Sequence, residues 1–434
     1  MVPRPCRLVV PPALALALAL LPAPAPPGAA QELAAVDGQT TTAERLRSEP
    51  WWPRKSFDSA AGHAGSAACA ECHGATHAAQ AATPMARTLA RAAPAHLGEV
   101  EAGAGAGEIE LGGYRYRLER TADGLGFTVG DGERSLAAPV EWVFGAGETG
   151  YTYVWERDGV FYESRFSYFP GLGRFAATPG RLLGPPASLE MALGHALPGP
   201  EAHGCFSCHS TAMAAGDRLD PRRLTPGVTC EGCHGPGADH VALAKSGLGA
   251  GAIFDPGGLG PDGVVDFCGA CHHTFWDVAV GTTRGIATAR SPSYRLVRSR
   301  CWGEGDPRLT CISCHDAHRE LERDAAAYDG ACRTCHGASA EHAAPAVQTE
   351  PSARAEPAAH GEIGGDAGAA AHREAEVHAK PAAHAEAAGG PPPCPVGTER
   401  CVDCHMAKVE LPEVHVESTD HWIRVVRPGE PFPE

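Results

Sequence analysis

Hydrophobic and polar residues alternate with period two over much of the stretch from about Glu108 to Pro170. Such alternation is typical of strands with one buried face, and Asp-Gly pairs favour tight hairpin turns. The pattern predicts strands at 114–118, 126–129, 151–155 and 161–166, with turns at Asp123-Gly124, Asp131-Gly132 and Asp158-Gly159. We therefore expect a small β-meander inserted into the chain.

A short apolar run, Ala13 to Leu21, follows Arg4 and Arg7 and leads into a stretch of Pro, Ala and Gly. This order of regions is typical of a secretory signal peptide, and we expect cleavage after Ala30. The run is too short to cross a bilayer, and no later segment is long and apolar enough to do so. The sequence therefore predicts an exported protein, periplasmic or extracellular, without a transmembrane segment.

The stretch from about 338 to 393 consists mainly of Ala, His, Glu, Pro and Gly. Because it cannot bury enough apolar area to order itself, we expect a disordered linker. The predicted organisation is then a signal peptide (1–30), an N-terminal segment (31–100), a β-rich insert (101–185), a core (186–337), the linker (338–393) and a C-terminal block (394–434).

The composition is poor in the residues that usually build a core. Apolar residues make up 43% of the chain, but much of this is Ala, aromatics are only 6%, and there are 53 Gly and 38 Pro. A chain of 434 residues normally carries more Leu, Ile, Val and Phe. The fold therefore needs another source of buried apolar surface.

Seven copies of Cys-x-x-Cys-His supply a candidate for that source. The motif is the attachment signature of c-type haem: both thiols reach one porphyrin, and the histidine offers an imidazole nitrogen to the iron. In chain order the expected attachment cysteines and proximal histidines are Cys69, Cys72 and His73; Cys205, Cys208 and His209; Cys230, Cys233 and His234; Cys268, Cys271 and His272; Cys311, Cys314 and His315; Cys332, Cys335 and His336; and Cys401, Cys404 and His405.

Other uses of Cys-x-x-Cys fit the repeat less well. A zinc site needs two such pairs, or one pair with two histidines, for each metal ion, and a thioredoxin-like pair occurs once. A disulfide framework has no reason to place His after every second cysteine. We therefore expect a mostly irregular and α-helical multihaem cytochrome core organised around seven covalent haem c groups, with the small β-meander inserted.

The chain is acidic, with a formal net charge of −16 that becomes −18 when the signal peptide and its two arginines are removed. Such a surface is a poor partner for nucleic acid or anionic membranes. We expect a redox protein as electron donor and another as acceptor. The sequence leaves their identity and homo-oligomer formation open.

Three strings resemble multihaem cytochromes related to cytochrome c554. They are Arg298 to Trp302 followed by Leu309 to His318, Gly227 to Gly237 followed by His240, and Cys401 to Met406 followed by Asp420-His421. In that family the haems pack as a wire with mostly bis-histidine ligation, so the resemblance implies electron transfer. The chain departs from the family in its long His-rich linker and in His77, which stands where we expect an aromatic residue.

A six-coordinate iron needs a second ligand, and fifteen of the 22 histidines lie outside the motifs. A histidine close to a motif in sequence usually reaches a neighbouring haem, because the chain cannot fold back across its own porphyrin so quickly. The candidates for distal ligand are His240, His318, His421, His342, His203, His195, His415, His77, His63 and Met85. The alternatives are solvated or hydrogen-bonded histidines and, for Met85, packing against a porphyrin edge.

Two cysteines of the expected mature chain, Cys301 and Cys394, lie outside the motifs. They could form a disulfide that ties the core to the last block across the linker. They could also remain unlinked thiols or lie with a sulfur near a haem.

Two functions remain. The first is an electron carrier in which every iron is six-coordinate. The second is a multihaem oxidoreductase that acts on a small nitrogen or sulfur compound at one open iron. Whether the chain is an enzyme stays open, but no motif marks an open iron and distal candidates are plentiful, so the carrier is favoured. If any iron is open or bound by Met85, we expect it at His73, which the β insert separates from the other motifs.

Overall fold

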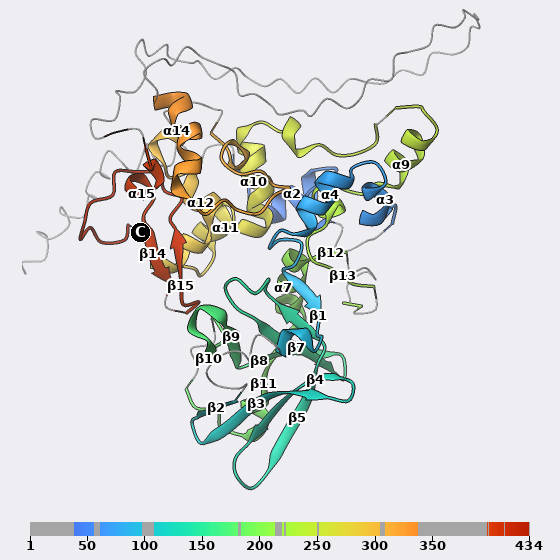
Figure 1. Cartoon of the computed structure of the whole chain (residues 1–434), viewed down its shortest axis with the longest axis vertical. Helices are drawn as coiled ribbons and strands as arrows, with labels where there is room; N and C mark the ends of the chain where they lie inside the picture. Colours follow the sequence, from blue (N-terminus) through green and yellow to red (C-terminus); the bar gives the residue numbers. More distant parts are fainter. Residues whose placement is uncertain are drawn as a thin grey trace, which may run out of the picture. The chain divides into compact units, whose positions relative to one another are not determined.

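The computed structural model describes residues 39–55, 61–97, 108–180, 184–212, 219–220, 223–249, 251–303, 309–336, 397, 399–411 and 413–433 (Figure 1). The chain divides into two compact units, one of residues 1–321 with 405–434 and one of residues 322–404. The expected signal peptide and linker, with His342 and Cys394, lie outside the described residues. In the described part of the chain, no helix is long and apolar enough to cross a membrane.

The antiparallel β structure expected in this region is present, and it is larger than a small meander. A four-stranded antiparallel sheet has the order β2 (Glu108–Leu111), β3 (Tyr114–Thr121), β4 (Gly124–Gly130) and β5 (Ser135–Val140). A five-stranded antiparallel sheet has the order β1 (Leu89–Arg91), β6 (Trp142–Phe144), β7 (Thr152–Arg157), β8 (Val160–Ser164) and β11 (Gly194–Leu197). Strands β1 and β11 come from either side of residues 101–185, so the sheet extends beyond the expected insert.

The turns explain why these strands pair as they do. Asp158 and Gly159 have φ values of +53° and +80° and join β7 to β8, with Arg157 opposite Val160. Two consecutive residues with positive φ form the tight turn that matches the twist of a hairpin, and Gly tolerates this conformation at no steric cost. The hairpin predicted from Asp158-Gly159 is therefore confirmed.

Most of the apolar core lies in this β region. The largest cluster of buried residues includes Tyr116, Phe127, Val129, Tyr153 and Trp155. Near the motifs the clusters are smaller, for example Trp52, Phe267 and Ala270. The shortage of large apolar residues noted in the sequence is thus concentrated where the motifs lie.

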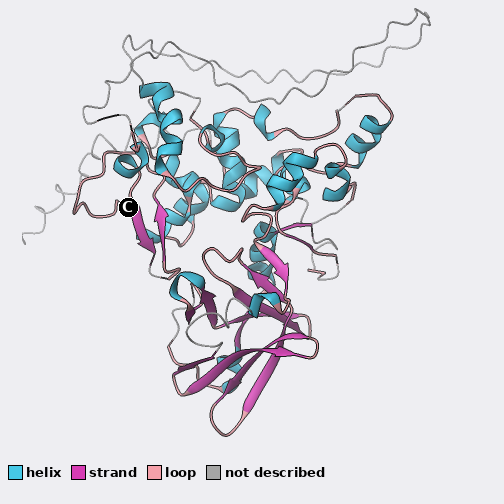
Figure 2. Ribbon diagram, viewed as in Figure 1, coloured by secondary structure: helices cyan, strands magenta, loops and turns pink. Residues whose placement is uncertain are grey.

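The larger unit also contains short helices, most of which Figure 2 shows apart from the two large sheets, while α6 packs against β4 and β5. Their bounds are α2 (Thr42–Ser48), α3 (Ser66–Ala70), α4 (Gly74–Ala81), α6 (Leu189–Leu193), α7 (Gly199–His209), α8 (Cys230–His234), α9 (Ala238–Lys245), α10 (Pro261–His272), α11 (Phe275–Val280), α12 (Pro292–Leu296) and α13 (Arg300–Gly303). The longest, α10, has 12 residues. Isolated helices of this length are marginal in water, so they depend on packing.

Short 3-10 helices and small hairpins complete this unit. The 3-10 helices are η2 (Pro170–Leu172), η3 (Pro256–Gly258), η4 (Gly285–Arg290) and η5 (Cys311–Ser313). The hairpins pair β9 (Phe166–Phe169) with β10 (Arg174–Ala177), β12 (Ser210–Ala212) with β13 (Thr225–Pro226), and β14 (Lys408–Leu411) with β15 (Val416–Thr419). The smaller unit contains η6 (Ala325–Tyr328), α14 (Asp329–His336) and the start of α15 (Cys401–His405).

Candidate functional site

Every Cys-x-x-Cys-His motif lies in or directly at the end of a helical turn. The second and fourth motifs end α7 and α10, the third forms α8, the sixth ends α14, and the seventh forms α15. The first lies at the end of α3, and the fifth starts with η5. Residues three apart on a helical turn share a face, so the two thiols of each motif project to the same side.

Two proximal histidines have their Nδ1 atoms occupied by backbone carbonyls. Nδ1 of His209 lies 3.2 Å from the carbonyl oxygen of Thr88 and 2.7 Å from its hydroxyl. Nδ1 of His234 lies 3.0 Å from the carbonyl oxygen of Phe254. A histidine that ligates a metal usually donates its other ring N–H to such an acceptor, which leaves Nε2 for the metal.

Three motif histidines have a second imidazole ring facing them. The ring centres of His73 and His240 are 6.4 Å apart, with an angle of 21° between the ring planes. Those of His234 and His318 are 5.9 Å apart at 6°. Those of His315 and His421 are 6.2 Å apart at 45°.

These separations fit one iron between each pair of rings. Two imidazoles that bind a metal from opposite sides through bonds of about 2.0 Å place their ring centres about 6.3 Å apart, since each centre lies about 1.15 Å behind its nitrogen. The donor set, two neutral nitrogens with two thiols nearby, is that of a c-type haem site.

Two of these ring pairs join different motifs. His240 follows the third motif by six residues but faces the histidine of the first motif. His318 follows the fifth motif by three residues but faces His234 of the third. A histidine close to the third motif in sequence therefore faces the first motif, and one close to the fifth faces the third.

Two of the facing histidines also have an occupied Nδ1. Nδ1 of His240 lies 3.1 Å from the carbonyl oxygen of Gly251, and Nδ1 of His421 lies 3.0 Å from that of Thr419. In both cases Nε2 is left available to a metal, as at His209 and His234.

The thiols of different motifs lie close together. Cys69 and Cys230 are within hydrogen-bonding reach, as are Cys208 and Cys271, and Cys268 and Cys311. Cys233 is near enough to Cys268 for their charges to interact. In space the motifs therefore follow the order first, third, fourth and fifth, with the second beside the fourth.

The sixth and seventh motifs are tied together within the smaller unit. Cys332 and Cys401 are within hydrogen-bonding reach. The carboxylate of Asp329 accepts hydrogen bonds from the backbone N–H groups of Arg400 at 2.7 Å and Cys401 at 2.8 Å. The bond from Cys401, followed by that from Arg400, lowers the pKa of Asp329 below its ordinary value.

A buried carboxylate links the first motif to the third. Glu231, which lies between the two cysteines of the third motif, is only 3% exposed. Its oxygens accept hydrogen bonds from the backbone N–H groups of Ala64 at 2.7 Å, Gly65 at 2.9 Å and Gly237 at 2.9 Å. The segment that leads into Cys69 is thus held against α8.

Burial keeps the imidazoles of this region neutral. It lowers the pKa values of His209, His272 and His315 from the ordinary histidine value. Burial, followed by the proximity of His315, lowers the pKa of His421 to about 4. A neutral imidazole has the lone pair that a metal ligand needs.

Burial also keeps some of the thiols protonated. It raises the pKa of Cys233 to about 12, and burial followed by the proximity of Cys230 raises that of Cys69 to about 11. Among the described cysteines no disulfide is formed, and Cys394 lies outside that part of the chain, so the question of a bond to Cys301 stays open.

The other expected distal ligands lie in varied surroundings. His63 has a 10% exposed side chain whose Nδ1 lies 3.8 Å from Glu231, and its buried Nε2 has no hydrogen-bond partner. His415 packs edge-on against Phe169, with ring centres 4.9 Å apart. His77 lies in α4, His195 in β11 opposite Glu163, and His203 in α7, while Met85 is 36% exposed.

Several residues that organise the site give no signal in the sequence. Thr88 and Phe254 act through backbone carbonyls, which any residue provides. In the sequence, Glu231 differs from other acidic residues only in its position between two motif cysteines. Arg295 pairs with Asp420 across 125 residues of sequence, a separation that no local pattern reveals.

No protein-family model matches the chain, and no curated protein matches it in sequence. Among solved structures, the chain is similar to "Crystal Structure of Outer Cell Wall Cytochrome OcwA", with a TM-score of 0.29 and 17% sequence identity. The match covers 49% of this chain and 37% of that cytochrome, so the chain spans little more than a third of its length. A likeness of this degree transfers neither fold family nor chemistry, and the function is argued from the residues of this chain.

Proposed function

We propose that this chain is an exported heptahaem c-type cytochrome that transfers electrons between haems with mostly bis-histidine ligation. The observation that carries the proposal is the set of three histidine pairs, whose ring centres lie 6.4, 5.9 and 6.2 Å apart. Seven helical turns with paired thiols support it, as does the resemblance of three strings to cytochromes related to cytochrome c554. When bound, the haem irons would supply the redox chemistry by cycling between ferric and ferrous states.

The histidine pairs indicate which residues would hold the irons. His73 and His240 would hold the iron at the first motif, and His234 and His318 would hold the iron at the third. His315 and His421 would hold the iron at the fifth. The remaining four motifs each contribute a proximal histidine, namely His209, His272, His336 and His405.

The proposed route for electrons follows the attachment sites in space and not in sequence. Contacts between thiols place the first motif beside the third, the third beside the fourth, and the fourth beside both the second and the fifth. The fourth motif is therefore the proposed branch point of the larger unit. The sixth and seventh form a separate pair in the smaller unit.

The proposed partners are a redox donor and a redox acceptor outside the cytoplasm. Covalent haem attachment fits the signal peptide expected at residues 1–30. The net charge of −16 favours partners with a basic surface at the site of contact.

The alternative, an oxidoreductase with one open iron, was expected to use the first motif. The pairing of His73 with His240 argues against an open iron there. Adding cyanide or nitrite to the ferric protein tests the choice, because only an open iron binds these ligands readily. A carrier shows an unchanged absorption spectrum. A change that saturates at one haem in seven would favour the oxidoreductase.

A further inference from the structure

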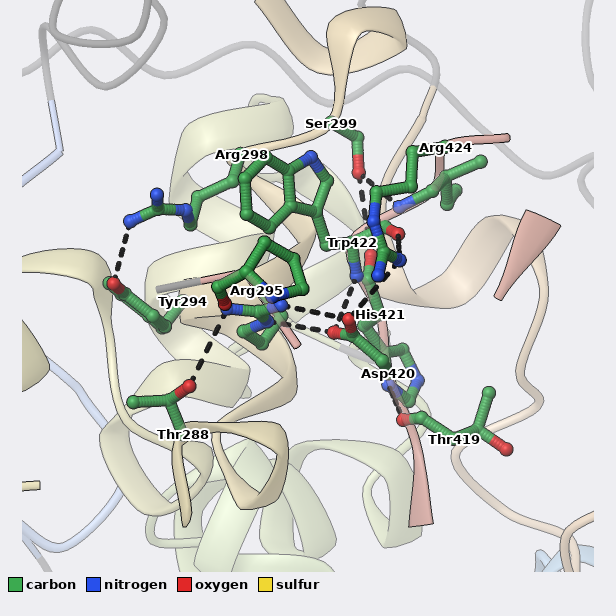
Figure 3. Close-up of polar contacts among 12 residues, drawn as sticks. Thr288, Tyr294, Arg295, Arg298, Ser299, Thr419, Asp420, His421, Trp422 and Arg424 are labelled. Atoms are coloured by element: carbon green, nitrogen blue, oxygen red, sulfur yellow. Dashed lines mark hydrogen bonds and ion pairs between the residues drawn. The ribbon is translucent and has the colours of Figure 1, made fainter. Parts of the chain in front are cut away.

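His421 lies on a segment that is anchored on both sides. It follows β15 by two residues, and the ring faces His315 of the fifth motif. Its neighbours Asp420, Trp422 and Ile423 all contact residues of the segment 295–299 (Figure 3). The position of the His421 ring is therefore set through its neighbours.

The strongest anchor is a fully buried ion pair. The side chains of Arg295 and Asp420 are both 0% exposed. Nε of Arg295 donates to one carboxylate oxygen of Asp420 at 2.7 Å, and Nη2 donates to the other at 2.8 Å. Two parallel hydrogen bonds between planar groups fix both the distance and the orientation of the carboxylate.

The guanidinium of Arg295 is itself held from several sides. It lies 4.9 Å from the ring centre of Trp422 and 4.5 Å from that of Phe432. Its Nη1 donates to the carbonyl oxygen of Pro433 at 3.1 Å and approaches the hydroxyl of Thr288 at 3.5 Å. The arginine therefore has little freedom to follow Asp420 if that residue moves.

The residues after His421 add two further anchors. The backbone N–H of Trp422 donates to Asp420 at 3.1 Å, which closes a tight turn around His421. The backbone N–H of Ile423 donates to the hydroxyl of Ser299 at 2.8 Å. Ser299 directly precedes α13, which leads toward the fifth motif.

A buried ion pair is a poor device for stability alone. Removing two charges from water costs about as much as their attraction returns, and apolar residues of similar size often serve stability equally well. Such a pair does fix the relative position of its two side chains. Here one of them, Asp420, directly precedes His421, whose imidazole faces His315.

We propose that Arg295 and Asp420 are positioning residues that hold the His421 imidazole opposite His315. This inference rests on the proposed role of His421 as the second axial ligand of the fifth motif. It goes further by assigning the geometry of that ligand to a buried ion pair that does not touch the iron. Loss of the pair is therefore expected to weaken ligation by His421 and to leave haem attachment unchanged.

The test uses the full-length protein with its haems attached. Asp420→Asn keeps the size of the side chain but removes its charge. The expected result is a new high-spin ferric signal of up to one haem in seven at low temperature, and binding of added imidazole at that one iron. Intact mass is expected to show seven haems, as in the unmodified protein. Where Asp420→Asn fails to mature, Arg295→Lys decides, because it keeps the charge and loses the two-pronged geometry.

The matched control is another buried carboxylate paired with an arginine. Asp266 has a 0% exposed side chain and lies 2.9 Å from Nη2 of Arg45. Asp266→Asn is expected to lower thermal stability without creating a high-spin iron. Asp420 also lies 3.5 Å from Nη1 of Arg424, so the double variant Arg295→Met with Asp420→Leu removes two charged contacts and is expected not to restore the ligation of His421.

The outcomes separate the two proposals. His421→Ala with an unchanged spin state contradicts the ligand assignment itself. If His421→Ala opens an iron but both Asp420→Asn and Arg295→Lys keep all irons low-spin, only the positioning role is wrong. An equal high-spin signal in Asp266→Asn, or full ligation in the double apolar variant, would also overturn the positioning role.

Discussion

The carboxylate of Glu231 is predicted to hold the first and third motifs together. It is 3% exposed and accepts hydrogen bonds from the backbone N–H groups of Ala64, Gly65 and Gly237. Glu231→Ala leaves these three donors without their acceptor. Glu231→Gln keeps one acceptor oxygen and places an amide N–H₂ group where the second oxygen was, so part of the network is lost.

The size of the effect follows from the three bonds. A buried donor that loses its acceptor costs about 1–3 kcal/mol. For the three donors together, Glu231→Ala is therefore expected to lower the free energy of opening this region by at least about 3 kcal/mol. Because about 1.4 kcal/mol corresponds to a factor of ten, protection of these amides against hydrogen exchange should fall about a hundredfold. For Glu231→Gln, with about half the loss, the expected fall is about tenfold.

Hydrogen exchange followed by mass spectrometry measures the protection of these amides on the protein with its haems attached. The faster exchange is expected in peptides that cover 61–68 and 235–241, while the β sheets keep their protection. Glu71→Gln is the matched control, since Glu71 also lies between motif cysteines but is 56% exposed and pairs with Lys245 on the surface at 2.8 Å. Such a pair contributes little, so exchange should not change. Equal exchange in Glu231→Ala and the unmodified protein would refute the reasoning.

Three further predictions concern haem content, acid and a hydrogen bond. Intact-mass spectrometry of the matured protein should show seven covalent haems, and each Cys-to-Ser change of a full motif should remove one. Burial lowers the pKa of the metal-free His421 imidazole to about 4, and a bound iron would compete further with the proton. The stability that the neutral ring contributes is therefore fully present above the unfolded pKa of 6.5 and is lost only as pH falls to about 4 or below. Unfolding free energies measured along an acid titration should show this loss, and His421→Ala should flatten it. Thr88→Val removes the hydroxyl 2.7 Å from Nδ1 of His209. It should raise the potential of one haem in a spectroelectrochemical titration, because the ligand becomes a weaker electron donor; identical potentials would rule out this role of Thr88.

The parts of the fold that depend on local chemistry could be read from the sequence. Asp158 and Gly159 specify a hairpin because both take positive φ, and strands flanking them alternate regularly. Strands β1 and β11 could not be read, since they have only three and four residues and are defined by their partners β6 and β8. The insert was therefore expected to be smaller than it is.

The site divides in the same way. Each Cys-x-x-Cys-His motif is one helical turn, so the residues that would attach a haem are close together and can be recognised in the sequence. Among the histidines outside the motifs, closeness to a motif in the sequence identified candidate ligands. Which motif each candidate faces depends on the tertiary fold. His73 and His240 are separated by 167 residues, and the carbonyls that occupy Nδ1 carry no side-chain signature.

Low-temperature electron paramagnetic resonance of three single variants tests the central proposal most directly. His240→Ala, His318→Ala and His421→Ala each remove one ring of a facing pair, and each should convert one low-spin ferric haem in seven to high spin. His415→Ala, which removes a ring that packs against Phe169, should leave the spectrum unchanged. Unchanged low-spin spectra in all three variants would contradict ligation by the facing histidines.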